Sequence, residues 1–405
     1  MVRTSCMNSP KLDWTGVAVL VWGTILLGVA VHGYLHPQAH TVFDVYRDAA
    51  RRWWAGQDMY EPGREIYRYS PFFAVAVWPF AMLPDAWGNA LWKVFNAVVF
   101  AAGFASWGAR VLPGRLTASQ IAILFLLVLP LAMHSLYNGQ ANMLMVGAAL
   151  LCLSAIVQEQ WTWAAGWLAL ATMIKAYPVG FALLLMALFP RRLALRYVAA
   201  LALMFLAPFA SQSFSFVTGQ YAGWYHLMHA STHITRERVR SVDNLFELAG
   251  HPLSPGMYPL LELLAGGIVL AICLSVQRHS VSRQTLLLRT YQWFAIWIAL
   301  FGPETEACTF VVLAPAIAWE LYLAFAGGAR IWTRLLLCAS LQLLGPLTSD
   351  LFPAPIRNFI NNHSGQTFGA LLFTAHLLCA TWRADAQRRI GAEYSGQSSA
   401  QANAA

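Results

Sequence analysis

A carboxylate and several arginines lie together just after the first apolar run of the sequence. Ten charged residues are interleaved there: Asp44, Asp48, Asp58, Glu61, Glu65, Arg47, Arg51, Arg52, Arg64 and Arg68. A carboxylate that is partly shielded from water can act as a general base toward a hydroxyl group. Asp44 is the candidate for this role, although a helix N-terminal charge with Arg47 or Asp48 nearby would also account for it.

Further cations on this sequence could bind an anion. Arg64 and Arg68 are four residues apart, so on a helix they would share one face and could hold a phosphate. Pairing of Arg64 with Glu61 and of Arg68 with Glu65 would leave no such site. Lys175 ends an apolar run just before a helix-breaking Tyr-Pro pair, where it either extends to the membrane surface or binds an anion.

Polar turns between apolar runs supply more candidates. Residues 138–142 read Asn-Gly-Gln-Ala-Asn, and the amides of Gln140 and Asn142 could bind hydroxyl groups, although a plain turn has the same composition. Glu304 and Glu306 flank a proline turn. They could act as second carboxylates on the acceptor side, or be ordinary loop charges.

The histidines and cysteines do not indicate a metal site. His226, His229 and His233 follow a helical spacing, but no carboxylate completes a zinc set, so we interpret them as surface residues. The six cysteines are scattered without paired spacing, which favours packing roles over disulfides or metal binding. We therefore expect no metal and no cofactor.

The elements that must position these residues are membrane helices. The chain is 58% hydrophobic and only 11% charged, and its apolar runs of about 17 to 22 residues match the thickness of a bilayer. The alternation typical of barrel strands is absent, so the predicted fold class is an all-α polytopic membrane protein. The net charge of +8 does not then indicate binding to nucleic acid. In a membrane protein, arginines mainly mark cytoplasmic loops and contacts with anionic lipid head groups. No phosphate-binding glycine motif indicates a nucleotide.

The hydrophobic pattern predicts a bundle of about twelve transmembrane helices. The first follows Lys11 without a clear cleavage site, so we expect it to be retained. Residues 41–54 predict a short interfacial helix, and the run 71–83 is short enough to be juxtamembrane rather than spanning. The predicted spans are 14–31, 87–108, 117–136, 141–157, 161–174, 178–190, 193–211, 257–276, 285–301, 308–326, 331–348 and 366–382.

The distribution of charge orients this bundle. With the N-terminus inside and 71–83 not crossing, the inner connections carry most of the 26 Lys and Arg residues. Most of the 18 acids then face outward, with a first outer loop at 33–84 and a long outer loop at 212–256. Arginines in these outer loops indicate an anionic ligand, and all the candidate residues lie on this side.

Six motifs occur in order along the first half of the chain. They are Phe43-Asp44-Val45-Tyr46, Gly56-Gln57-Asp58-Met59-Tyr60, Tyr67-Arg68-Tyr69-Ser70-Pro71-Phe72-Phe73-Ala74, Pro79-Phe80-Ala81-Met82-Leu83-Pro84, Asn138-Gly139-Gln140-Ala141-Asn142 and Ile174-Lys175-Ala176-Tyr177-Pro178. Together they resemble glycosyltransferase family 87, whose members are polytopic enzymes of the GT-C class. The pattern is similar to that of the mycobacterial mannosyltransferase that elongates phosphatidylinositol mannosides.

The resemblance implies transfer of a sugar, often mannose, from a polyprenyl-phosphate donor to a lipid or glycan acceptor on the outer face, with inversion. The family's proposed base falls on Asp44, and its GQxN and KxxP motifs fall on Gln140, Asn142, Lys175 and Pro178. The residues then expected to bind the donor phosphate or sugar are Lys175, Arg68, Arg64, Gln140, Asn142 and Tyr69. It also implies a GT-C-like bundle with juxtamembrane helices in the first outer loop.

Downstream, the sequence departs from the family pattern. A usual Asn-Gln-Ser-Leu stretch has its nearest counterpart in Asp243-Asn244-Leu245. A usual Ser-Pro stretch with Trp-x-His-His is replaced by Gly-Pro-Glu-Thr-Glu at 302–306. The missing histidines bear on recognition of the donor phosphate, and hence on which donor is used.

We expect one membrane domain over residues 1–392, a disordered tail over 393–405 and a location in the inner plasma membrane. The expected partners are the lipid-linked donor, the acceptor and membrane lipids. Two other hypotheses stay open. A transporter or flippase of a lipid-linked saccharide would need two similar halves and ionisable residues near the midplane, and a non-catalytic assembly subunit would not need Asp44.

Overall fold

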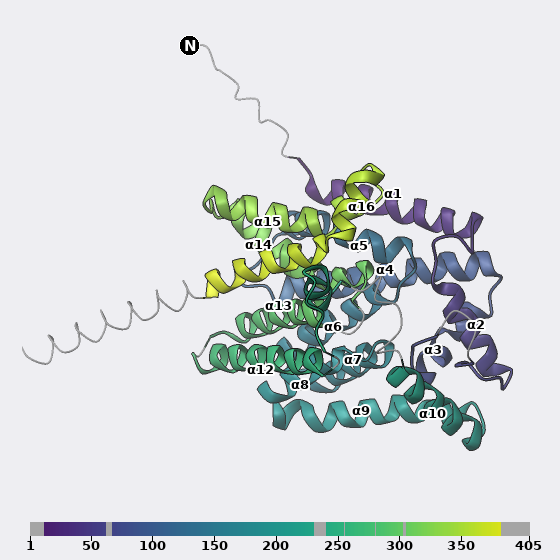
Figure 1. Cartoon of the computed structure of the whole chain (residues 1–405). Helices are drawn as coiled ribbons and strands as arrows, with labels where there is room; N and C mark the ends of the chain where they lie inside the picture. Colours follow the sequence, from purple (N-terminus) through teal and green to yellow (C-terminus); the bar gives the residue numbers. More distant parts are fainter. Residues whose placement is uncertain are drawn as a thin grey trace, which may run out of the picture.

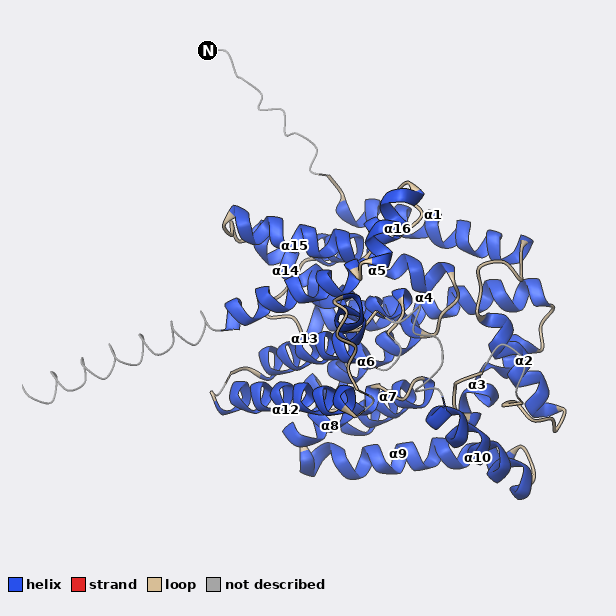
Figure 2. Cartoon of the chain, viewed as in Figure 1, coloured by secondary structure: helices blue, strands red, loops and turns tan. Residues whose placement is uncertain are grey.

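The secondary structure is helical throughout the part of the chain that the computed structural model describes, residues 12–61, 67–230, 240–254, 256–279, 281–302 and 305–381. These ranges contain no strand (Figure 2). The helices are α1 (Trp14–Leu35), α2 (Phe43–Trp54), α3 (Pro71–Ala81), α4 (Asp85–Arg110), α5 (Ala118–Tyr137), α6 (Asn142–Val157), α7 (Trp161–Ile174), α8 (Pro178–Leu188), α9 (Leu195–Leu206), α10 (Phe214–Ala230), α11 (Val242–Leu248), α12 (Met257–Arg278), α13 (Arg283–Phe301), α14 (Ala314–Ala326), α15 (Ile331–Leu344) and α16 (Ala354–Asn362). Residues 365–381 are also helical.

Each of the predicted spans coincides with a helix, so the all-α class is confirmed. Among the described residues, seven helical stretches are long and apolar enough to cross a membrane: Trp14–Leu35, Asp85–Arg110, Ala118–Tyr137, Pro190–Ala210, Met257–Arg278, Ala307–Ala326 and Ile331–Thr348. Helices α3, α6 and α8 are apolar but shorter. The chain is therefore a multi-pass membrane protein, and the count of twelve crossings stays a prediction.

Helix α3 illustrates why length matters for the topology. Its 11 residues rise about 16 Å, roughly half the hydrocarbon thickness of a bilayer. Pro71 opens the helix, and Pro79 lies within it. Helix α8, which lies in a predicted span, has the same 11 residues, so the topology of 71–83 stays a prediction.

Capping residues fix where several helices begin. The Asp13 carboxylate accepts the Thr15 N–H at 3.0 Å and starts α1. Thr117 and Gln120 form a reciprocal capping box at the start of α5. Pro178 occupies the first turn of α8, where its missing N–H has no intrahelical partner to lose.

The centre of the bundle is α6, almost all of whose residues are buried. It packs directly against the backbone of α4 through two glycines. A Cβ on Gly103 would lie 2.3 Å from the Gly147 carbonyl oxygen, and a Cβ on Gly147 would lie 2.6 Å from the Val99 carbonyl oxygen. Small residues at such crossings allow membrane helices to approach closely. The second half of α4 is thereby packed closely against α6.

Helices α1, α9 and α12 lie at the periphery and bury few residues. Figure 1 shows α1 and α9 on opposite sides of the bundle. Their exposed residues are largely apolar, which suits contact with lipid tails rather than with water.

A buried polar network joins α13, α14 and the helix at residues 365–381. Glu320 Oε1 accepts a hydrogen bond from Gln292 Nε2 at 2.8 Å and lies 3.4 Å from Arg289 Nη1. Glu320 Oε2 lies 3.0 Å from His376 Nε2. A carboxylate within a helical membrane bundle needs such partners, because lipid supplies none.

Helices α2, α3 and α10 gather at one end of the bundle, and residues 365–381 end on the opposite side (Figure 1). The segment predicted as a long outer loop, 212–256, contains α10 and α11. It contacts the segment predicted as the first outer loop, since Gln220 Oε1 accepts the Met59 N–H at 3.0 Å and Trp224 Nε1 donates to the Arg68 carbonyl at 3.2 Å. Helix α10 is thus joined to the segment that contains α2 and α3.

Candidate functional site

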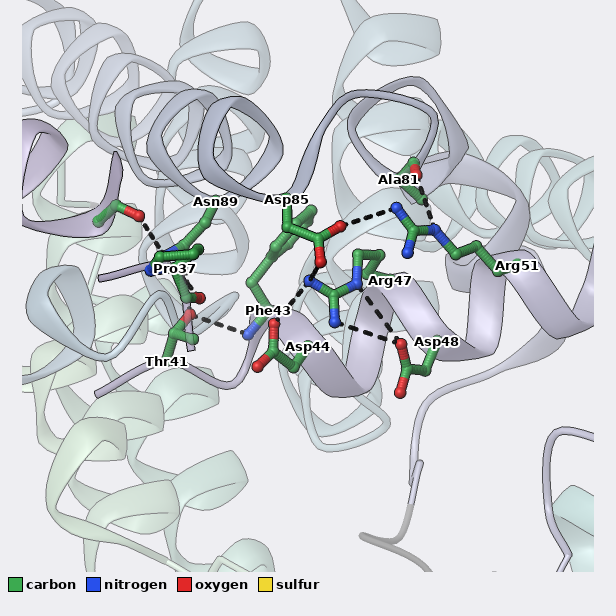
Figure 3. A network of polar contacts seen from close by, with 11 residues as sticks. Pro37, Thr41, Phe43, Asp44, Arg47, Asp48, Arg51, Ala81, Asp85 and Asn89 are labelled. Atoms are coloured by element: carbon green, nitrogen blue, oxygen red, sulfur yellow. Dashed lines mark hydrogen bonds and ion pairs between the residues drawn. The ribbon is translucent and has the colours of Figure 1, made fainter. Parts of the chain in front are cut away.

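Asp44 is the second residue of α2, the short helix that the sequence predicted over residues 41–54. Apolar side chains bury one face of this helix, and charged side chains line the other. Thr41 Oγ1 accepts the Phe43 N–H at 3.1 Å and donates to Asn89 Oδ1 at 2.9 Å, so α4 fixes the start of α2 (Figure 3). A negative charge at this position interacts favourably with the helix dipole.

A charged cluster surrounds Asp44, made of Asp44, Arg47, Asp48 and Arg51 on α2 and Asp85 on α4. Arg47 Nη1 lies 3.0 Å from Asp44 Oδ1 and also 3.0 Å from Asp85 Oδ2. Arg47 Nε lies 3.4 Å from Asp48 Oδ1. Figure 3 shows the second oxygen of Asp44 directed away from Arg47. The Arg47 neighbour expected of a helix N-terminal charge is therefore present.

The turn at 138–142 is held against the start of α2 and against α4. The Val42 N–H donates to the Asn138 carbonyl at 2.9 Å, and Trp92 Nε1 donates to the Gly139 carbonyl at 2.7 Å. The fully buried Lys93 donates to the Tyr137 carbonyl at 2.7 Å. Gly139 has φ +62°, and a Cβ there would lie 3.1 Å from Thr41 Oγ1, so this position requires glycine.

Two amide groups in this turn are buried but not satisfied. Gln140 is 8% exposed and Asn142 is 1% exposed. Within the described part of the chain, no hydrogen-bond partner reaches Gln140 Oε1 or Asn142 Nδ2. A buried polar atom without a partner is costly, and in native structures it commonly marks a place for water or a ligand.

Lys175 lies in an aromatic cluster with Tyr46, Tyr69 and Tyr177. It follows α7 in extended conformation, and its Nζ is 5.9 Å from the Tyr69 ring centroid and 5.7 Å from that of Tyr177. The Tyr46 and Tyr69 hydroxyls are 2.7 Å apart, and the Tyr177 hydroxyl donates to Asn142 Oδ1 at 3.4 Å. Burial lowers the pKa of Lys175, and the nearby Glu306 carboxylate opposes that shift.

Glu306 faces a second cation, Arg240. Burial lowers the pKa of Arg240, and again the charge of Glu306 raises it. The Arg240 N–H donates to the Thr305 carbonyl at 2.8 Å, and Arg240 Nη1 donates to Asn361 Oδ1 at 2.8 Å. Glu306 itself is held in a capping box with Thr309 at the start of the 3₁₀ segment η5 (Ala307–Leu313). One carboxylate is thus within electrostatic reach of two cations from separate parts of the chain.

Comparison with known proteins assigns the chain to a family. The sequence pattern of glycosyltransferase family 87 matches residues 67–303, more than half of the 405 residues. The chain belongs to glycosyltransferase family 87. Among solved structures, it is similar to ArnT from Cupriavidus metallidurans bound to undecaprenyl phosphate, with a TM-score of 0.41 and 15% identity over 89% of this chain and 77% of that chain. No curated protein matches the chain.

Membership of family 87 confirms the resemblance that the motifs indicated, and it makes the chain a membrane glycosyltransferase. The transporter and assembly-subunit hypotheses are set aside on this ground. The matched range contains Arg68, Tyr69, Gln140, Asn142 and Lys175, whereas Asp44 lies before it and Glu306 after it.

The structure brings several of the predicted residues together. Lys175, Tyr69 and Asn142 are linked through the aromatic cluster, and Glu306 is near Lys175. Arg68 is partly buried, and its carbonyl contacts α10. Arg64 and Glu304 lie outside the described residues, as does the predicted pairing of Arg64 with Glu61 and of Arg68 with Glu65.

Asp44 belongs to a different face of α2 from the aromatic cluster. Tyr46 is two residues further on, about 200° around the helix axis, and it contacts Tyr69. Asp44 instead points with Arg47 toward Asp85. The base candidate and the cation candidate therefore belong to separate clusters.

Sequence reasoning missed several residues of these clusters, namely Tyr46, Tyr177, Arg240, Cys308 and Asp85 as members of the site. Tyr46 and Tyr177 stand inside family motifs, which was a usable signal. Arg240, Cys308 and Asp85 gave none, because their neighbours come from distant parts of the chain. Cys308 Sγ lies 3.8 Å from Asn138 Nδ2 and joins the 138–142 turn to the Glu306 region.

The histidines predicted to be surface residues lie on or beyond α10. His226 and His229 belong to α10, and His233 is outside the described residues. Throughout the part of the chain that the structure describes, no group of three His, Cys, Asp or Glu side chains could hold a metal ion.

Proposed function

We propose that this protein transfers a hexose, most simply mannose, from a polyprenyl-phosphate donor to a lipid or glycan acceptor, with inversion. The reaction takes place on the outer face of the inner plasma membrane. Asp44 is the general base, and Lys175 is the principal cation for the leaving phosphate. Arg68, Tyr69, Gln140 and Asn142 complete the donor site, with Arg64 as a further phosphate contact.

The observation that carries this proposal is the position of the 138–142 turn. One side of the turn is bonded to the start of α2, through the Val42 N–H and the Asn138 carbonyl. Its other side approaches the Lys175 and Glu306 region through the Asn138 contact with Cys308 and the Asn142 contact with Tyr177. A sugar held by the unsatisfied Gln140 and Asn142 amides would have a carboxylate on one side and a cation on the other.

This arrangement matches what an inverting displacement requires. The acceptor oxygen forms a bond to the anomeric carbon while the bond from that carbon to the phosphate oxygen breaks. The acceptor proton passes to the Asp44 carboxylate, and the electron pair of the broken bond leaves with the phosphate. A phosphate leaving group needs no proton, so one carboxylate suffices and the acid and base pair of hydrolases is not required.

Two cations support the phosphate side of the proposal. Lys175 is half-buried, so its ammonium is less hydrated than one at the surface and attracts an anion more strongly. Arg240 approaches the same carboxylate, Glu306, from the segment that follows α10. In a chain that lacks the usual histidines after α13, these two cations are suited to replace them. Glu306 then favours the protonated forms of Lys175 and Arg240 rather than acting as a second base.

The test is to incubate the purified protein with polyprenyl-phosphate hexoses in detergent or nanodiscs and to follow sugar transfer. We expect transfer to an added membrane-lipid fraction, and slow hydrolysis of the donor when no acceptor is present. Mannose, glucose and galactose donors are compared at equal concentration. Absence of both transfer and hydrolysis across these donors would overturn the proposed donor class.

A further inference from the structure

Asp85, the first residue of α4, has no role in the reaction as described so far. It shares one guanidinium nitrogen with Asp44, because Arg47 Nη1 is 3.0 Å from a carboxylate oxygen of each (Figure 3). Arg51 holds Asp85 from the other side, with Nη2 at 2.9 Å from Asp85 Oδ1 and Nε donating to the Ala81 carbonyl at 3.1 Å. Asp85 is therefore fixed in place while it competes for Arg47.

The exposure of these side chains decides how strongly their charges interact. The Arg47 side chain is 8% exposed, Asp44 is 24% exposed and Asp85 is 38% exposed. Asp48, at 57% exposed and 3.4 Å from Arg47 Nε, is better screened by water. The interaction of Arg47 with Asp44 and Asp85 is therefore less screened by water than its interaction with Asp48.

Other charged and titratable groups complete the surroundings. Helix α3 contributes no charged residue to this region. On α4, the Lys93 ammonium interacts with the Asp44 charge. Lys93 in turn lies 3.5 Å from the His40 carbonyl and 5.7 Å from the centroid of the Tyr137 ring.

A cation bound to Asp44 alone would make its carboxylate a weaker base, because the cation favours the ionised form. We propose that Asp85 is a positioning residue that shares Arg47 and so keeps Asp44 basic enough to accept the acceptor proton. Arg47 then orients Asp44 without neutralising it. This inference rests on the proposed function, in which Asp44 is the base.

The test is the pH dependence of single-turnover transfer in Asp85→Asn. Loss of the Asp85 charge leaves Arg47 to Asp44, so the acid limb of the profile should move to lower pH. Turnover on the plateau should fall about threefold to tenfold, because a weaker base transfers the proton less readily. The donor KM should stay unchanged, and Asp85→Glu should restore the wild-type limb.

Two further variants make the outcome specific. Asp48→Asn removes the same charge from the better screened side of Arg47, and it should move the acid limb less. Arg51→Gln removes a cation from Asp85, so the limb should move to higher pH, and this variant tests the idea even if Asp85→Asn does not fold. If Asp44→Asn abolishes transfer but neither Asp85→Asn nor Arg51→Gln moves the limb, Asp85 is only structural. If Asp44→Asn transfers normally, the proposed function itself fails.

Discussion

The two clusters beside the 138–142 turn differ in how they hold their charges. Around Asp44, carboxylates and guanidinium groups contact each other at about 3 Å and stay partly hydrated. Around Lys175, the neighbours are phenol rings, amides and a carboxylate that acts without a direct ion pair in the contacts described. A partly hydrated carboxylate that shares its cation with a second carboxylate is suited to exchange a proton. A poorly hydrated ammonium among aromatic rings is suited to bind an anion.

The largest expected effect comes from Asp44→Asn, which removes the proposed base from the charged cluster. Asparagine keeps the shape and the hydrogen bonding but cannot accept a proton, so turnover should fall by about 10²–10⁴. Donor binding, measured by titration in nanodiscs, should stay near wild type. Asp48→Asn, one helical turn away and more exposed, is the matched control and should be much milder. Equal losses in the two variants would mean that Asp44 acts only through the charge of the cluster.

Lys175→Ala removes the cation from the aromatic cluster and should have the second largest effect on activity. Loss of the cation should cost about 2–4 kcal/mol of transition-state stabilisation, seen as a lower kcat/KM for the donor. Thermal unfolding should change little, since Lys175 lies at the end of α7 rather than within it. Lys175→Arg should recover part of the activity. Normal transfer by the alanine variant would reduce Lys175 to a residue that extends to the membrane surface.

Glu306→Gln should give a smaller change with a definite sign. Burial lowers the pKa of Lys175, so donor binding that needs the ammonium is lost on the alkaline side at a lower pH than for an ordinary lysine. Removal of the Glu306 charge should lower that pKa further and move the alkaline limb of kcat/KM to still lower pH. Glutamine retains an oxygen for the cap of η5. An alkaline limb that moves upward would contradict the assignment of Glu306.

The sequence predicted the elements better than it predicted the clusters. Apolar runs and helical spacing located every predicted span and the short helix α2, because hydrophobic periodicity is a local property. The hydrophobic pattern predicted only a loop over 212–256, since α10 and α11 lack the length or hydropathy of a span. The contact between Arg47 and Asp85, and the approach of Arg240 to Glu306, join distant segments. No local pattern could indicate those pairings.

Family motifs compensated for this limit only in part. They named Gln140, Asn142 and Lys175, which the structure places around one turn. They gave no indication that Asp44 and Tyr46 face opposite sides of α2. That division follows from the helical repeat together with the burial of Tyr46, and it is the basis for assigning separate tasks to the two clusters.

The most direct test of this division is the full pH profile of single-turnover sugar transfer in wild type, Asp85→Asn and Glu306→Gln. We predict a bell-shaped profile in which Asp85→Asn moves only the acid limb and Glu306→Gln moves only the alkaline limb. A profile without an acid limb, or a variant that moves both limbs together, would contradict the claim that one cluster accepts the proton and the other binds the leaving phosphate.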